Sequence, residues 1–90
     1  MSAAVHELSI ALSLVDLASE KASAIGPVRV DAVFVRIGPL SGVVKEALLF
    51  CFDEAARGSA IEGARLEIED GDGRDLDLTA LEVSDCAANR

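Results

Sequence analysis

The sequence predicts one small α/β domain in which two helices pack on one face of a three-stranded mixed sheet, in the order α-β-α-β-β. Three observations support this fold class. Apolar residues recur at helical spacing in two segments, β-branched or alternating residues mark three others, and turns rich in glycine separate them. The chain has 90 residues, of which 51% are hydrophobic, so we expect residues 1–90 to form a single domain around one core.

The first expected helix runs from about Val5 to Ala24 and is apolar over most of its circumference. The side that we expect to cover the sheet carries Leu8, Ala11, Leu12, Val15, Ala18 and Ala22. A second side carries Ile10, Leu14 and Leu17, and it needs another helix or a partner protein to cover it. A Gly-Pro pair at positions 26 and 27 ends the helix.

Residues 28–37 are rich in β-branched residues and are expected to form a strand. Alternation places Val33, Val35 and Ile37 on one face, and Val30, Ala32, Phe34 and Arg36 on the other. A second helix is expected over residues 43–57 and ends at a glycine. Cys51 falls on its apolar face, whereas Phe50 falls on the face that should meet water and is therefore a candidate interface residue.

Residues 65–69 and 74–83 alternate as half-buried strands should, and Asp70–Gly73 lies between them. This pattern predicts an antiparallel hairpin. Residues 84–90, which include Cys86, are expected to be a disordered tail.

Charge and composition exclude several classes of function. The net charge is −8 and the eight lysine and arginine residues are spread singly, which argues against nucleic acid and against an anionic membrane. We find no signal peptide, no membrane span and no disulfide framework, so we expect a cytoplasmic protein. One histidine and no nucleophile or phosphate-loop motif argue against an enzyme.

Four separate segments carry a resemblance to a known family. They are His6-Glu7-Leu8-Ser9-Ile10-Ala11, the run from Val35 to Val43, Glu46-Ala47-Leu48, and Glu62-Gly63-Ala64. Together they resemble the HypA/HybF family, the nickel-delivery accessory proteins of [NiFe]-hydrogenase maturation. The resemblance extends from His6 to about Asp70 and implies the same fold as the periodicity does.

The family resemblance also implies a zinc domain, held by two CxxC pairs, between the last two strands. In this sequence Asp70–Gly73 occupies that place, and there is no CxxC. A structural zinc site needs about four cysteine or histidine ligands at fixed spacing. We therefore expect no zinc and interpret the chain as a nickel domain alone.

For nickel, the resemblance implies a site at the N-terminus made of the terminal amine, the following backbone amides and a histidine imidazole. Such a square-planar nitrogen set suits Ni(II). His6 and Glu7 match the family's ligand positions, Glu7 mainly through its backbone. Residues 1–4 form an N-terminal extension that separates the amine from His6. We hypothesise that the native chain starts at Val5, read as Met from a GTG codon; a native chain that starts at Ser2, detected by mass spectrometry, would contradict this.

The resulting hypothesis is a nickel metallochaperone-like accessory protein that assists Ni(II) insertion into a metalloenzyme such as [NiFe]-hydrogenase. The resemblance implies a maturation GTPase and the hydrogenase large subunit as partners, and we expect Ile10, Leu14, Leu17 and Phe50 to contact them. An alternative remains open, in which the chain is a metal-free, HypA-like interaction module. Self-association as a homodimer, through the first helix or a sheet edge, is compatible with either.

Overall fold

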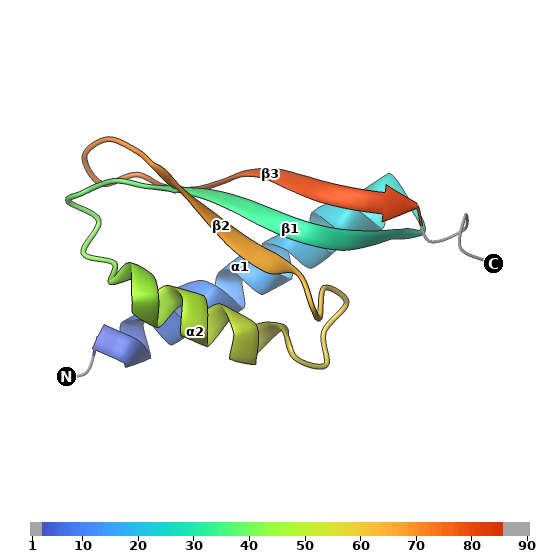
Figure 1. Ribbon diagram of the computed structural model, residues 1–90, viewed down its shortest axis with the longest axis horizontal. Coiled ribbons are helices and arrows are strands. Elements are labelled where there is room, and N and C mark those ends of the chain that lie inside the picture. The colour runs from blue at the N-terminus through green and yellow to red at the C-terminus, as the bar shows by residue number, and fades with distance from the viewer. Residues whose placement is uncertain (1–2, 86–90) are drawn as a thin grey trace.

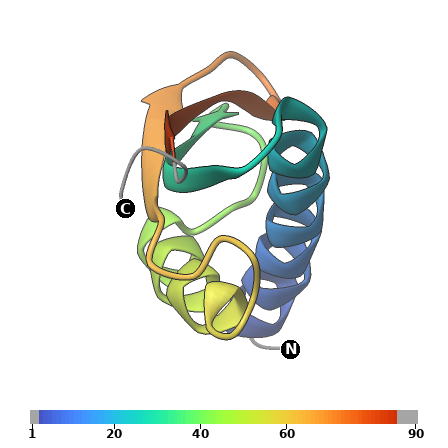
Figure 2. The same ribbon diagram turned by 90° about the vertical axis from the view of Figure 1, so that its right-hand side faces the viewer.

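The computed structural model describes residues 3–85 and confirms the expected fold class and element order. Helix α1 spans Ala3–Ile25, strand β1 Val28–Ile37, helix α2 Lys45–Ala56, strand β2 Arg65–Asp70 and strand β3 Leu76–Asp85. The two helices lie on one face of the three-stranded sheet, and the other face is uncovered (Figures 1 and 2). No helix among these residues is long and apolar enough to cross a membrane.

The sheet order is β2-β1-β3, with β1 parallel to β2 and antiparallel to β3. The expected hairpin is therefore wrong, because β2 and β3 lie on opposite sides of β1. The turn between them crosses the end of β1: Gly71 N–H donates to the Ile37 carbonyl at 2.9 Å, and Gly38 N–H donates to the Asp75 carbonyl at 2.9 Å. Strand β1 is the most apolar of the three, and it takes the central place, where another strand pairs with each of its edges.

The core lies between the sheet and the two helices. From β1, Val33 and Val35 are fully buried, and from α2 so is Leu48, while Phe52 is 1% exposed. The register pairs Val33 with Leu66, which is also buried. Cys51 is 6% exposed, which confirms its place on the buried face of α2.

Two irregularities in the pairing of β1 with β3 change which residues face the core. The register shifts between Val30 and Ala32, so Asp31 is an extra residue and Val30 turns toward the helices, where it is 3% exposed. The expectation that Val30 shares a face with Ala32 is therefore wrong, because strict alternation fails at a bulge. The second shift, between Phe34 and Val35, leaves Thr79 as the extra residue of β3.

A salt bridge crosses the uncovered face of the sheet. Ala32 is the register partner of both Arg65 and Glu82, and the small alanine lets the Arg65 Nη2 atom come within 2.9 Å of Glu82 Oε1. The Arg65 Nε atom also lies 2.7 Å from Glu67 Oε2. These acceptors, Glu67 first, raise the pKa of Arg65 above its ordinary value. The bridge thus ties both edge strands across β1.

Helix α1 is rotated about its axis relative to the sequence-based expectation. Leu14 is 6% exposed and belongs to the core, whereas Leu8 and Leu12 are 41% and 49% exposed. The face that packs against both α2 and the sheet is built on Ala11 and Ala18, both fully buried, whose small side chains allow close approach. Leucines that were assigned to the sheet-covering side are thereby left in solvent.

The ends of the fold differ from the expected boundaries. Helix α1 begins at Ala3 rather than at Val5, so two residues of the expected extension are helical. Strand β3 continues to Asp85, so a tail that starts at residue 84 is wrong. Cys86 and the rest of that expected tail lie outside the described residues.

Candidate metal and docking site

His6 is exposed near the beginning of α1 and lies at one end of an open hollow between this helix and β3. The hollow has a volume of about 390 Å³ and is mostly apolar. Its walls are His6, Ser9, Ile10, Ser13, Leu14 and Leu17 from the helix, and Leu76 and Leu78 from the strand. An exposed imidazole at this position is free to reach a ligand that enters from solvent.

Glu7 has a different environment, although it is the next residue. Its side chain is fully buried, and its Oε2 atom accepts a 2.7 Å hydrogen bond from the backbone N–H of Val44. Val44 is the N-cap of α2, and its own side chain makes no capping hydrogen bond. A carboxylate from α1 therefore sits at the positive end of the α2 dipole and replaces the missing cap. No local sequence signal marks this contact, because the two residues are 37 positions apart.

The side chains of the two residues expected at the metal site point in different directions. Adjacent helical residues point about 100° apart, so His6 faces the hollow and Glu7 faces α2. The second oxygen of Glu7, Oε1, is buried and has no hydrogen-bond partner among residues 3–85. Within the same residues there is no group of three or more His, Cys, Asp or Glu side chains that could hold a metal ion. His6 therefore belongs to no such group in the described part of the chain.

The backbone of this region is helical. Because α1 begins at Ala3, the amide N–H of Glu7 stands at the hydrogen-bonding position for the carbonyl four residues earlier, that of Ala3. A square-planar nickel chelate needs amide nitrogens that are not committed in this way. Metal binding through the backbone at His6 and Glu7 thus requires the first turn of α1 to open.

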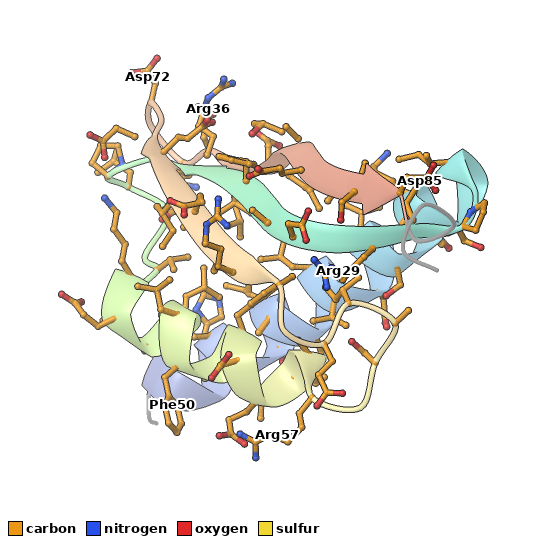
Figure 3. The ribbon with its side chains drawn as sticks, turned by 45° about the vertical axis from the view of Figure 1, so that its right-hand side comes forward. Arg29, Arg36, Phe50, Arg57, Asp72 and Asp85 are labelled. Carbon is orange, nitrogen blue, oxygen red and sulfur yellow. The ribbon has the colours of Figure 1, made fainter. Side chains whose placement is uncertain are left out.

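The residues expected to contact a partner fall into two places. Ile10, Leu14 and Leu17 line the same hollow as His6, although only Leu17, at 39% exposed, offers much surface. Phe50 lies on α2, is 68% exposed, and points away from the sheet (Figure 3). Its exposure is as expected from helical spacing. Because Phe50 does not line the hollow, the four residues do not form one continuous surface there.

A second hollow, of about 410 Å³, continues along the same side of the molecule. It lies between the last turns of α1 and the middle of β3, and it shares Leu78 with the first hollow. Its walls are Lys21, Ala24, Ile25, Leu78, Thr79, Ala80 and Leu81. The two hollows together are called the trench. The sequence did not predict it, because it depends on the distance between α1 and the edge of β3.

Comparison with known proteins is consistent with this architecture. The family described as "HypA: Hydrogenase/urease nickel incorporation, metallochaperone, hypA" matches residues 5–82. A hydrogenase maturation factor HypA of Roseiflexus sp. is 59% identical over 66 residues, which cover 73% of this chain and 54% of the relative. The corresponding protein of Chlorobium luteolum is 49% identical over 70 residues, covering 78% of this chain and 60% of the relative.

A third relative, the hydrogenase maturation factor HypA of Azotobacter chroococcum, is 51% identical over 70 residues, which cover 78% of this chain and 62% of the relative. The chain thus spans between about half and two thirds of the length of these curated relatives. The family match includes His6, Glu7 and the first seven of the ten residues of β3. On these grounds, the chain belongs to the HypA family of hydrogenase and urease nickel-incorporation metallochaperones.

Proposed function

We propose that this protein handles Ni(II) as cargo for a maturing metalloenzyme such as [NiFe]-hydrogenase, with His6 as the side-chain anchor of the metal. Membership of the HypA family carries this proposal. The exposed imidazole at the beginning of α1 supports it, because a delivery site must be reachable both by free metal and by the acceptor. A cytoplasmic location and a non-catalytic role follow from the same proposal.

Glu7 has two roles in this proposal. Its backbone supplies an amide nitrogen next to the imidazole, while its buried side chain holds the beginning of α1 against α2. Nickel binding opens the first helical turn and leaves the Glu7–Val44 contact as the point from which the rest of α1 continues. The metal site is then a local rearrangement on a rigid support.

Docking is the second part of the proposal. A maturation GTPase and the hydrogenase large subunit are the proposed partners, and Phe50 on α2 and Leu17 on α1 are exposed apolar residues suited to contact them. Ile10 and Leu14 line the same hollow as Leu17 but are too buried to contribute much contact area. Phe50→Ser tests this part, because it removes an exposed ring without touching the core.

The experiment for the metal is a nickel titration, by calorimetry and absorbance, of two forms of the chain. One form is the chain as given, and the other begins at Val5 changed to Met, so that His6 directly follows the terminal amine. We expect the shorter form to bind one Ni(II) with a square-planar absorbance band. The band should be lost in His6→Ala.

The other outcomes are informative. Binding by the chain as given through His6 would mean that ligands other than the terminal amine complete the site, and it would contradict the proposed geometry. Absence of binding by both forms would remove the nickel role and make the metal-free interaction module the better account. Light scattering on the same samples separates a homodimer from a monomer.

A further inference from the structure

Among residues 3–85, no further strand pairs with the outer edge of β2 or of β3, but the two edges are not equivalent. Strand β2 is an edge of six residues with four charged side chains, a pattern that discourages pairing with another chain. Strand β3 is an edge of ten residues, and its charged residues, Asp77, Glu82 and Asp85, are all acidic. The outward-facing N–H and C=O groups of an edge strand are a template for an added strand.

The trench lies beside this long edge. Helix α1 approaches β3 at the C-terminal ends of both elements and falls away from the sheet toward its own N-terminus (Figures 1 and 2). A helix of 23 residues is about 35 Å long and a strand of ten about 33 Å, so the two walls match in length. The two hollows share Leu78 and follow each other along β3. Together they form the trench, a wedge-shaped space between α1 and the outer edge of this strand.

The bulge at Thr79 divides the edge into two stretches. Leu76–Leu78 borders the hollow that contains His6, and Ala80–Asp85 continues past the hollow that contains Lys21. The Thr79 hydroxyl donates to the Phe34 carbonyl at 3.2 Å and holds the bulge against β1. A strand that pairs with either stretch has an apolar wall on the helix side. On the open side it lies next to Asp77 and Glu82 of β3, whose neighbours across the sheet are Arg36 and Arg65.

From this geometry we infer that the β3 edge and the trench under it bind an extended segment of a partner protein, in which apolar residues alternate with basic ones. Its apolar side chains fill the wedge against Leu17 and Leu78, and its basic side chains lie on the open face near Asp77 and Glu82. A helix would fill the wedge but leave the main-chain groups of β3 unpaired. The net charge of −8 favours the basic partner over an acidic one.

A second copy of this chain fits less well. Pairing β3 with β3 brings the acidic residues of two edges together, with no lysine or arginine in either strand to compensate. Like charges directly opposite each other in a sheet are destabilising. This inference concerns docking alone, so a failure of the nickel titration leaves it standing.

The test is selection of random ten-residue peptides, displayed on phage, against the immobilised chain as given. We expect the enriched peptides to alternate apolar and basic residues. Binding of a synthetic enriched peptide should weaken by about tenfold or more in Leu17→Lys and stay within about twofold of the parent in Leu12→Lys. Leu12 is the matched control, because it is an exposed leucine of the same helix that does not line either hollow.

Ser13→Lys provides a second variant, since Ser13 is exposed on the wall of the first hollow and its change leaves the core intact. Bound peptide should also slow amide hydrogen exchange in β3. The inference is overturned by no enrichment, by enriched peptides with helical spacing or acidic residues, or by equal effects of Leu17→Lys and Leu12→Lys. A dimer that competes with the peptide would assign the edge to self-association and overturn it as well.

Discussion

Replacing Glu7 by alanine tests whether the contact between the two helices is an important source of stability. The change removes the hydrogen bond that the Val44 N–H donates to the Glu7 carboxylate, a kind of contact that contributes about 1.5–3 kcal/mol. It also removes a favourable interaction with the α2 dipole, worth up to about 2 kcal/mol in partly buried sites. Relief of the buried Oε1, which has no partner within residues 3–85, offsets part of the loss.

The net expectation for Glu7→Ala is a loss of about 2 kcal/mol in the free energy of unfolding. For a domain of this size that corresponds to a fall in Tm of about 8–16 °C. Urea unfolding followed by far-ultraviolet circular dichroism is a suitable assay, because the chain has no tryptophan or tyrosine to report by fluorescence. Glu46→Ala is the matched control, since Glu46 is an exposed acid in the first turn of α2 and should contribute only about 0.3–1 kcal/mol.

A double-mutant cycle locates the effect at the hydrogen bond itself. Val44→Pro removes the N–H donor, and the backbone φ of −88° at Val44 lies near the range of proline. In that background Glu7→Ala should cost less than it does in the parent chain. The reasoning is refuted if Glu7→Ala is no worse than Glu46→Ala, or if the cost is the same with and without the donor.

Three further predictions test other parts of the molecule. Phe52→Ala should lower the free energy of unfolding by about 3–5 kcal/mol, because it leaves a cavity at the centre of the core; an unchanged urea midpoint would contradict this. Gly38→Ala places a Cβ in steric clash with the Gly73 carbonyl oxygen, so we expect a loss of about 1–3 kcal/mol, whereas Gly58→Ala, with no atom nearby among the described residues, should show only the cost of its φ of +79°. Phe50→Ser should leave the Tm within a few degrees of the parent value while it weakens binding to a maturation partner in calorimetry; a large fall in Tm would mean that the ring is packed.

The helices and strands could be predicted because each has a periodicity that its own residues carry. Phe50 illustrates this, since helical spacing alone assigned it to solvent and it is 68% exposed. The hairpin failed because alternation describes the faces of a strand but says nothing about its neighbour, and the chain passes from β2 across the end of β1. The prediction of which face Val30 occupies was wrong for a related reason, because a bulge is a property of two paired strands.

The candidate site likewise has parts that could be predicted from the sequence and parts that could not. His6 could be singled out because it is the sole histidine and lies in a string that resembles a known family. The burial of Glu7 at the end of α2 could not, because its partner is a backbone N–H and any residue type carries one. The trench beside β3 was also hidden, since it depends on the angle between α1 and the sheet.

The sequence by itself determined the elements, their order and the acidic net charge, because these depend on composition and on spacing along one chain, and its motifs carried the resemblance to the family. Only the tertiary structure decided that β1 is central, that Glu7 caps α2, and that Leu14 is buried while Leu12 is exposed. These are outcomes of packing between elements. The free energy of burial depends on what each side chain meets across the core, and that is settled only when helices and sheet come together.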